Sequence, residues 1–568
     1  MKNLLSVLTL LMVPLLIFTS CGPKEEPADT IIFGGNIYTV DENNPAVEAV
    51  AVRGDRIVFA GDMADAEKFK GDATEMLDLE GRTMTPGWIE GHGHFFGMGQ
   101  SKLNLDLSQV KNYDEMIAMV KEAAENAAPG TWILGRGWHQ SKWDEEPEEV
   151  VNGFQTHNKM SEVTPDNPVW LTHASGHAAF GNAKAMEIAG VTSETANPEG
   201  GEIIKNELGN PTGIFNERAM GLVSRNVPYN NEGDDKRAMA LAIQECLTNG
   251  ITTFHDAGSG RETIDLMKNF LDSGAMKVRL YVMLTGRDRD LLQEYYAKGP
   301  EIGLGNNHLT IRSVKLNTDG ALGSRGAWLL RPYTDRPETA GLETQPMDYV
   351  LQVAKEGLEH GFQVCAHAIG DRANQEVLDR FEQAIKENPS KAEDHRFRIE
   401  HAQHLAASDI PRFGELGVIA SMQAVHMSSD RPWAITRLGE ERIKEGAYVW
   451  RKLFDTGAVI MNGTDVPVEP INPIASFYAS VTRQTLDGTP PGGFEPDQKM
   501  TREEGLHSYT LAGAYGGFEE DIKGSIEVGK LADFTVLSQD IMTVPDNEIL
   551  DTKVDMTIVG GKVLYTRN

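Results

Sequence analysis

Eight short apolar runs recur along the middle of the chain, and segments with helical periodicity separate each run from the next. They are the runs at residues 86–92, 251–258, 277–284, 310–320, 362–371, 397–403, 418–423 and 458–465. Near-continuous apolar strands that alternate with helices are typical of a parallel sheet covered on both faces. Because eight such units close on themselves, the pattern predicts an α/β fold with a (β/α)8 TIM barrel.

The two ends of the chain show a different pattern, of short strands separated by glycine turns. Residues 30–84 and 516–568 are predicted to pair into one composite β-sandwich, which leaves residues 85–515 as the barrel. The barrel segment is roughly 430 residues long, whereas a bare barrel needs about 250. The excess lies mainly in residues 98–245, which we expect to form an inserted subdomain that serves as substrate pocket or lid.

The N-terminus carries a segment that does not belong to the fold. Lys2 precedes an apolar run that is too short to span a bilayer comfortably, and small residues follow it. Residues 1–20 therefore predict a signal peptide, with Cys21 as the lipidated cysteine of a bacterial lipoprotein and residues 21–29 as a tether. That interpretation anchors the protein in a membrane outside the cytoplasm, on its periplasmic side or at the cell surface. The alternative is an ordinary secretory signal with Cys21 incidental.

The charge balance narrows the class of partner. The chain has a formal net charge of −31, from 84 acidic and 53 basic side chains. Nucleic acids and anionic membrane surfaces repel such a protein, so we expect neither of them as a partner. Cys246 and Cys365 are far apart in the sequence, predict no disulfide framework and are expected in the core.

Residues that bind metals or move protons stand at the ends of most barrel runs. His92 and His94, two residues apart at the end of the first run, point the same way on an extended strand. The later runs add, in chain order, Lys315, His367, His401 and Asp465. In a barrel all strand ends open on one face, so these six side chains are predicted to converge on a metal centre. Taken singly, each could be a satisfied core residue or part of a strand-end turn.

The lysine in this set needs a special explanation, because a lysine inside an apolar strand is costly unless it is paired or modified. Beside two metal ions, a neutral Lys315 can take up carbon dioxide, and the resulting carbamate is an anionic bridging ligand. We therefore expect one or two divalent ions, zinc in the first place, and a carboxylated lysine when two ions are bound.

Several short sequence motifs resemble those of one protein family. The ligand pattern and the phrases TPGWIEGHGHFFG, KLNTDGALGSRGA, AHAIGDRA, RIEHAQ and GTDVPVEPINP are similar to the amidohydrolase superfamily, in its amidohydrolase-3 or YtcJ-like branch. The resemblance covers about residues 30–568 and implies the same barrel with a composite sandwich. The branch includes relatives described as using one metal, which leaves open the number of metals and the state of Lys315.

A metal ion at such a centre lowers the pKa of a bound water to about 7 and polarises a carbonyl. We expect hydrolysis of a non-peptide C–N bond in a small amide, with Asp465 acting first as general base and then as general acid. The alternatives are a deacetylase, an esterase or an isomerase on the same scaffold, or a non-catalytic binding lipoprotein. The resemblance is also compatible with a homodimer.

Five further residues are candidates for substrate contacts. His177 is similar to a histidine that the family places near substrate, and His404 is a candidate for binding a carbonyl oxygen. Trp138 lies in the insertion, where it could equally belong to a small core of that subdomain. Asp319 and Arg325 follow Lys315 on the loop expected above the metals, although a structural Asp–Arg pair is the more usual explanation of such neighbours. The rings that favour an apolar or aromatic substituent on the substrate are Trp88, Phe95, Phe96, Trp138 and Trp143.

Overall fold

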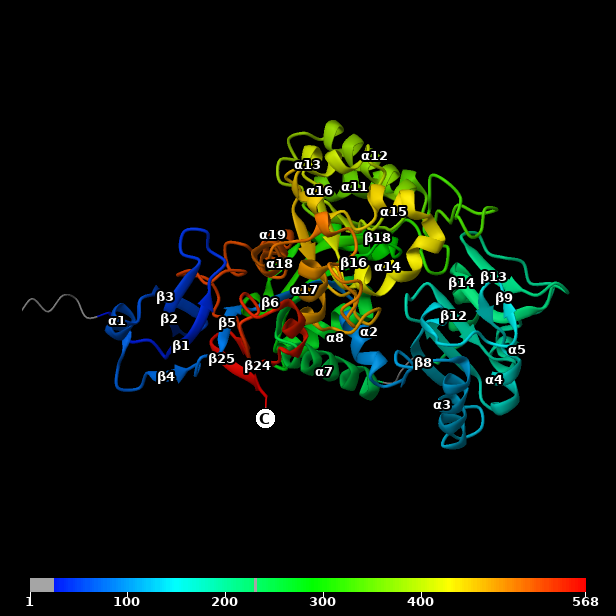
Figure 1. Cartoon of the computed structure of the whole chain (residues 1–568), viewed down its shortest axis with the longest axis horizontal. Helices are drawn as coiled ribbons and strands as arrows, with labels where there is room; N and C mark the ends of the chain where they lie inside the picture. Colours follow the sequence, from blue (N-terminus) through cyan, green and yellow to red (C-terminus); the bar gives the residue numbers. More distant parts are fainter. Residues whose placement is uncertain (1–24, 229–231, 568) are drawn as a thin grey trace, which may run out of the picture.

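The computed structural model of the protein describes residues 25–228 and 232–567. Three bodies follow one another along the longest axis of the molecule (Figure 1). A sheet built from both ends of the chain lies at one end, a barrel in the middle and the insertion at the other end. The predicted signal peptide and Cys21 lie outside the described residues. No helix within the described ranges is long and apolar enough to cross a membrane.

The terminal sheet joins the N- and C-terminal segments directly. Its strands are β1 Thr30–Tyr38, β2 Ala46–Arg53, β3 Arg56–Gly61, β4 Glu75–Asp78, β5 Thr83–Pro86, β23 Phe534–Leu537, β24 Val554–Val559 and β25 Lys562–Thr566. They run in the order β25-β24-β23-β5-β1-β2-β3, with β4 beside β1. Strand β23 pairs antiparallel with β5, the last strand before the barrel. The folding of these segments into a two-layer sandwich stays a prediction.

Two residues that the sequence places in the tether pack against this sheet, although β1 itself begins at Thr30. Asp29 N donates a hydrogen bond to Val52 O at 2.8 Å, and Ala28 is only 3% exposed. The short helix α1 (Met63–Ala66) packs beside the same strands.

All eight predicted runs form strands of one parallel barrel, which confirms the predicted (β/α)8 fold. In their order around the barrel, the strands are β6 Trp88–Gly93, β15 Ile251–Ser259, β16 Arg279–Thr285, β18 Leu309–Asn317, β19 Gln363–Ala368, β20 Arg398–His401, β21 Ile419–Met422 and β22 Ile460–Asn462. Their side chains are almost entirely buried, as expected for strands covered on both faces. A short antiparallel strand, β17 (Glu301–Gly303), adds to β18.

The barrel closes between its first and last strands through hydrogen bonds rather than through a regular ladder. Asp465 N donates to His92 O at 2.8 Å, and Thr464 N donates to the carboxyl group of Glu90 at 2.7 Å. Because Glu90 and His92 lie on β6, the chain after β22 is held directly beside the first strand. This contact brings Asp465 to the carboxyl end of β6.

Helices cover the outside of the barrel and pack through apolar faces. In α12 (Asp371–Glu387), Val377, Phe381 and Ala384 are buried at helical spacing. The other helices around the barrel are α2 Phe95–Ser101, α7 Glu232–Thr248, α8 Arg261–Asp272, α9 Arg289–Lys298, α10 Leu304–Asn307, α11 Met347–His360, α13 Ile410–Leu416, α14 Ala424–Leu438, α15 Glu440–Gly446, α16 Trp450–Phe454, α17 Pro473–Thr482, α18 Arg502–Ser508 and α19 Leu511–Gly516.

The insertion has its own sheet and its own apolar clusters. In their order across the sheet, its strands are β13 Gly201–Lys205, β14 Pro211–Glu217, β12 Ala178–Gly181, β11 Val169–His173, β8 Ile133–Trp138 and β7 Leu105–Asp106. A separate pair is formed by β9 Val150–Val151 and β10 Phe154–Gln155. The helices are α3 Tyr113–Glu125, α4 Asn158–Val163, α5 Ala183–Ala189 and α6 Gly221–Ser224.

The terminal sheet and the insertion contact opposite ends of the barrel (Figure 1). Arg279, at the start of β16, forms a buried bidentate pair with Asp533 beside the terminal sheet, with distances of 2.6 and 2.9 Å. The terminal sheet therefore lies at the amino ends of the barrel strands. The insertion is left at the carboxyl ends, where barrel enzymes place their active sites.

Candidate metal centre and substrate pocket

The six side chains predicted as metal ligands lie at the carboxyl ends of barrel strands or shortly after them. They are His92 on β6, His94 just beyond it, Lys315 on β18, His367 on β19, His401 on β20 and Asp465 in the loop after β22. Because parallel barrel strands open on one face, these residues meet although they are far apart in the sequence.

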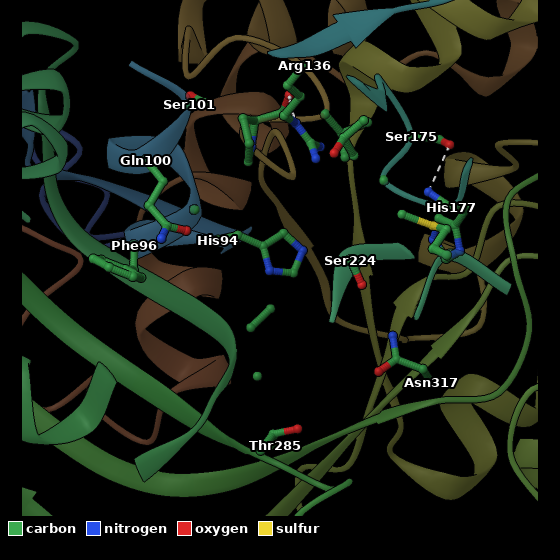
Figure 2. Close-up of a pocket in the computed structure, with 18 of the residues that line it drawn as sticks. His94, Phe96, Gln100, Ser101, Arg136, Ser175, His177, Ser224, Thr285 and Asn317 are labelled. Carbon is green, nitrogen blue, oxygen red and sulfur yellow. Dashed lines mark hydrogen bonds between the residues drawn. The ribbon is translucent and has the colours of Figure 1, made fainter. Parts of the chain in front are cut away.

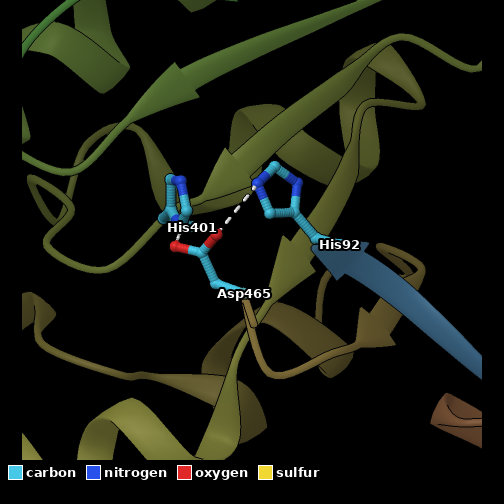
Figure 3. Close-up of side chains that lie close together, drawn as sticks. All are labelled: His92, His401 and Asp465. Carbon is cyan, nitrogen blue, oxygen red and sulfur yellow. Dashed lines mark ion pairs between the residues drawn. The ribbon is translucent and has the colours of Figure 1, made fainter. Parts of the chain in front are cut away.

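Three of them form the core of the centre: His92, His401 and Asp465 each offer one ligand atom, and these atoms lie within 4.8 Å of one another (Figure 3). Asp465 Oδ1 lies 3.6 Å from His92 Nε2, and Oδ2 lies 4.0 Å from His401 Nδ1. The backbone is left-handed at two of them, with φ of 77° at His401 and 57° at Asp465. Residues other than glycine rarely adopt this conformation, and such strain concentrates at functional sites.

The other three predicted ligands surround this core. His94 Nε2 lies 3.3 Å from Asp465 Oδ1, and Lys315 Nζ lies 3.0 Å from His92 Nε2. The ring of His367 packs against the neighbouring histidine of the core, with 4.5 Å between ring centroids. The structure therefore brings all six predicted residues together around one point.

The protonation states of the centre suit a divalent cation. Burial, together with a neighbouring lysine charge, lowers the pKa of His92 to about 4. Burial also holds the pKa of His367 and of His401 well below the usual value, and neutral imidazole is the form that binds metals. Burial by itself would raise the pKa of Asp465, but the surrounding histidines hold it well below its usual value. The centre thus offers neutral imidazoles and an ionised carboxylate.

Two buried atoms of the centre, His367 Nε2 and Asp465 Oδ1, have no hydrogen-bond partner among the described residues. Leaving a buried polar atom unpaired costs about 1–3 kcal/mol, and a metal ion would satisfy lone pairs of this kind. Burial lowers the pKa of Lys315, so this amine loses its proton more readily than an exposed lysine and repels a cation less. These side chains therefore fit a divalent metal.

Further residues that the sequence analysis did not single out hold the ligands in place. Glu400 accepts a hydrogen bond from His92 Nδ1, and Arg398 donates to both oxygens of Glu400, at 2.7 and 2.9 Å. Gln423 Oε1 accepts from His401 Nδ1 at 2.8 Å. Such partners fix the ring orientation and tautomer of a metal-binding histidine. The sequence RIEH could have revealed this support, because its arginine and glutamate lie inside a buried strand and charged residues there need partners.

The centre opens into a pocket of about 1020 Å³ between the barrel and the insertion. Both bodies contribute side chains, among them His94, Thr285 and Asn317 from the barrel and Arg136 and His177 from the insertion (Figure 2). A large concave site at this end of a barrel is the expected place for a small-molecule substrate.

Two of the five predicted substrate contacts line this pocket. His177 Nδ1 lies 3.0 Å from Glu217 Oε2, and its ring lies 5.1 Å from that of His367. Asp319 accepts hydrogen bonds from three backbone N–H groups at 2.8 to 3.1 Å, although burial raises its pKa to about 7. Backbone N–H groups therefore account for most of the contacts of Asp319. His177 comes from the insertion and lies beside the metal centre.

Trp138 does not line the pocket, which corrects the prediction of a substrate contact there. Its ring is fully buried in the core of the insertion, and its Nε1 donates to Leu171 O at 2.9 Å. The register between β8 and β11 shifts at this point, where Gly137 has φ of 107°. In a regular strand, Arg136 and Trp138 would point to the same face because they are two residues apart. The β-bulge at Gly137 turns their side chains to different faces.

His404 and Arg325 also lie away from the pocket lining. His404 is buried against Tyr448, with 5.4 Å between ring centroids. Strand β20 ends at His401, where φ is positive, so His404 lies beyond the strand end at which the metal ligands meet. Arg325 forms a salt bridge with Asp335 at 2.9 Å, so a structural pairing accounts for it.

The aromatic rings expected at the barrel mouth are mostly internal. Trp88 and Phe95 are fully buried, and Trp143 stacks on Tyr113 inside the insertion. Of the five predicted rings only Phe96 lines the pocket. The predicted preference for an apolar or aromatic substituent therefore loses most of its support.

The barrel, the cluster of candidate metal ligands and the pocket above it together define a metal-dependent hydrolase. The chain belongs to the amidohydrolase family, whose sequence profile matches residues 75–565, and the predicted family is thereby confirmed.

Similar proteins span almost the whole chain. It is 30% identical to the putative amidohydrolase YtcJ of Bacillus subtilis over 542 residues, 94% of this chain and 99% of that one. It is 27% identical to an N-substituted formamide deformylase of Arthrobacter pascens over 552 residues, 95% of this chain and 98% of that one. The crystal structure of an uncharacterized metal-dependent hydrolase from Pyrococcus horikoshii matches with a TM-score of 0.72 and 26% identity, covering 91% of this chain and 99% of that chain.

Proposed function

We propose that the protein hydrolyses a non-peptide C–N bond of a small amide with a metal-activated water. The Asp465 carboxylate carries this proposal most directly. It is 6% exposed, its pKa is held low, its Oδ1 has no hydrogen-bond partner among the described residues, and it borders the pocket. A relative that is named N-substituted formamide deformylase acts, by that name, on small amides of this kind.

A divalent ion bound at this centre would supply Lewis-acid activation of the water and of the substrate carbonyl. Asp465 is the proton carrier: it accepts the proton of the attacking water and delivers it to the departing nitrogen. Burial disfavours a charged His177, but Glu217 outweighs that effect and raises the pKa of His177 above its usual value. His177 is thereby kept as a hydrogen-bond donor, suited to the carbonyl oxygen of the substrate.

The proposed cofactor is one or two zinc ions held by the six residues at the strand ends. With two ions bound, Lys315 would be carboxylated and would supply an anionic ligand. Metal analysis of the purified protein, with the ions located by anomalous scattering, tests this proposal. A metal-free protein that stays active after exhaustive chelation would overturn it.

The reaction is tested by a panel of N-acyl and N-formyl amides, esters and acetylated sugars, assayed with zinc-loaded protein. Hydrolysis of amides with at most weak activity on esters supports the proposal. Deacetylation, ester hydrolysis or isomerisation as the main activity would favour the alternatives on the same scaffold, and complete inactivity would favour a binding protein.

Asp465→Asn tests the assignment of the proton carrier. We expect kcat to fall by about 10²–10⁴-fold while substrate binding is largely kept, because the carboxylate is needed only in the transition state. Steady-state kinetics on the best amide of the panel gives both values. Wild-type turnover by this variant would refute the role of Asp465.

For the cellular location we propose a lipoprotein anchored through Cys21, outside the cytoplasm, acting on a small molecule. The acidic charge of the chain, −31, supports the absence of a nucleic-acid partner. A homodimer is compatible with this proposal and is tested by sedimentation or light scattering.

A further inference from the structure

Three arginines line the pocket, and none of them has a carboxylate within 4.0 Å among the described residues. Arg136 comes from β8 of the insertion, Arg218 follows β14, and Arg287 follows β16 of the barrel. Most other arginines of this acidic protein form ion pairs at 2.5 to 4.0 Å. Arginines without an acidic partner are thus unusual in this protein, and three of them line the pocket.

The acidic groups of the same pocket are, by contrast, engaged inside the protein. Asp465 belongs to the metal centre, Asp319 accepts backbone N–H groups, and Glu217 holds His177. Asp256 accepts from the backbone N–H of Phe95 at 2.8 Å. Each of these carboxylates thus has a partner inside the protein, whereas the three arginines have no carboxylate within 4.0 Å among the described residues.

Arg136 is the best placed of the three. Its Nε donates to Pro467 O at 3.3 Å and its Nη2 to Ala174 O at 3.0 Å, which leaves Nη1 without a partner in the described residues. Figure 2 shows its guanidinium pointing into the cavity on the side of His94. Pro467 follows Asp465 by two residues, so Arg136 is fixed beside the reaction centre by the same loop. Burial lowers the pKa of Arg136 to about 10, opposed by the charge of Asp465, so the side chain stays cationic at neutral pH.

Arg218 and Arg287 are more exposed and lie near each other. Burial and the charge of Arg218 lower the pKa of Arg287, and the charge of Glu217 offsets only part of this effect, as expected for two like charges that lie near each other. Arg218 also donates to Thr344 O, which holds it at the pocket wall. The pair adds two further positive charges to the lining of the pocket.

We propose that the pocket selects amides that carry a carboxylate close to the scissile nitrogen, such as N-acyl amino acids, and that Arg136 binds this carboxylate. This inference rests on the proposed amide hydrolysis. Arginine matches a carboxylate with strong, directional, charge-assisted hydrogen bonds. A monoanion fits better than a dianionic phosphate, because Asp465, Asp319 and Glu217 lie in the same pocket. Arg218 and Arg287 attract the anion and accept longer acidic substituents.

The test compares two amides that differ only in the carboxylate: N-formylphenylalanine and N-(2-phenylethyl)formamide. We expect zinc-loaded wild-type protein to prefer the acid in kcat/KM. Arg136→Gln should lower this preference by about 10- to 100-fold, mainly through KM, since charged hydrogen bonds carry roughly that factor. Arg136→Lys should restore part of the preference. Arg225→Gln is the matched control, because Arg225 is exposed near the pocket but does not line it.

A second variant guards against misfolding of Arg136→Gln. The double change Arg218→Gln with Arg287→Gln alters exposed side chains and should lower the preference by about 2- to 5-fold, with a weaker dependence on salt. Calorimetric titration of the Asp465→Asn variant with the two amides gives the binding preference independently of turnover.

The outcomes distinguish failure of the carboxylate site from failure of the proposed amide hydrolysis. Equal kcat/KM for the acid and the neutral amide, or a preference unchanged in the arginine variants, would overturn the carboxylate site and leave amide hydrolysis intact. If neither amide nor any other in the panel is hydrolysed, the proposed function fails. Arginine-dependent binding of N-formylphenylalanine in the calorimeter would then still establish the anion site.

Discussion

Replacing Glu400 by glutamine removes the charge that positions the first histidine of the metal centre. Glu400 is fully buried, accepts from His92 Nδ1 and is paired with Arg398 through two hydrogen bonds of 2.7 and 2.9 Å. Burial opposes its ionisation, but Arg398 and His92 hold the pKa of Glu400 well below its usual value, so the carboxylate is charged at neutral pH.

Two separate losses follow from Glu400→Gln. Breaking a buried ion pair leaves Arg398 without its anion, which costs about 3–5 kcal/mol of folding free energy. The ring of His92 loses its charged acceptor, and loss of such a partner typically weakens metal binding by about 10–100-fold. At saturating zinc the second loss removes roughly 1.4–2.7 kcal/mol of metal-linked stabilisation.

Competition with a chromogenic chelator measures the zinc affinity, and thermal unfolding with and without zinc measures the two stability losses separately. Glu519→Gln is the matched control. Glu519 is also buried and forms an ion pair, with Lys523 at 2.6 Å, but its other side-chain partner is Thr310 rather than a candidate metal ligand. We expect this control to lose stability and to keep its zinc affinity.

An unchanged zinc affinity in Glu400→Gln would refute the argument that Glu400 supports the metal through His92. Equal losses of affinity in Glu400→Gln and Glu519→Gln would refute it as well, because the effect would then reflect general destabilisation.

Three further predictions concern the metal bridge, the docking of the terminal sheet and the membrane anchor. Lys315→Ala should lose the second metal and regain part of its activity with added acetate; full metal content and rate in this variant would make Lys315 structural. Asp533→Asn should lower the unfolding free energy by about 3–5 kcal/mol at pH 7, since it breaks the buried pair with Arg279. Burial disfavours the charge of Asp533, but Arg279 holds its pKa below the usual value. That stabilisation is therefore present above about pH 4 and lost as the pH falls through the lower folded-state pKa, so the gap between variant and wild-type melting temperatures should close in acid. Cys21→Ser should move the protein into the soluble fraction of fractionated cells, and unchanged membrane association would contradict the lipid anchor.

The barrel and its convergent residues could be predicted from the sequence because both depend on local pattern. Each of the eight apolar runs is long enough to predict its own strand. In a parallel barrel the carboxyl ends of all strands lie on the same face. His92, His367 and His401 needed no knowledge of loops to be placed together. Asp465 follows the last strand closely enough for the same argument to hold.

Only the tertiary structure decided which side chains of the insertion face the centre. Arg136 and Trp138 are two residues apart on β8, and strand alternation by itself would give them the same face. The bulge at Gly137 places Arg136 in the pocket and Trp138 in the core. Likewise, no local pattern pairs Glu400 with His92, since that contact exists only when β20 and β6 face each other across the closed barrel. Strand positions follow from the order of residues along the chain, but contacts between elements depend on how those elements dock.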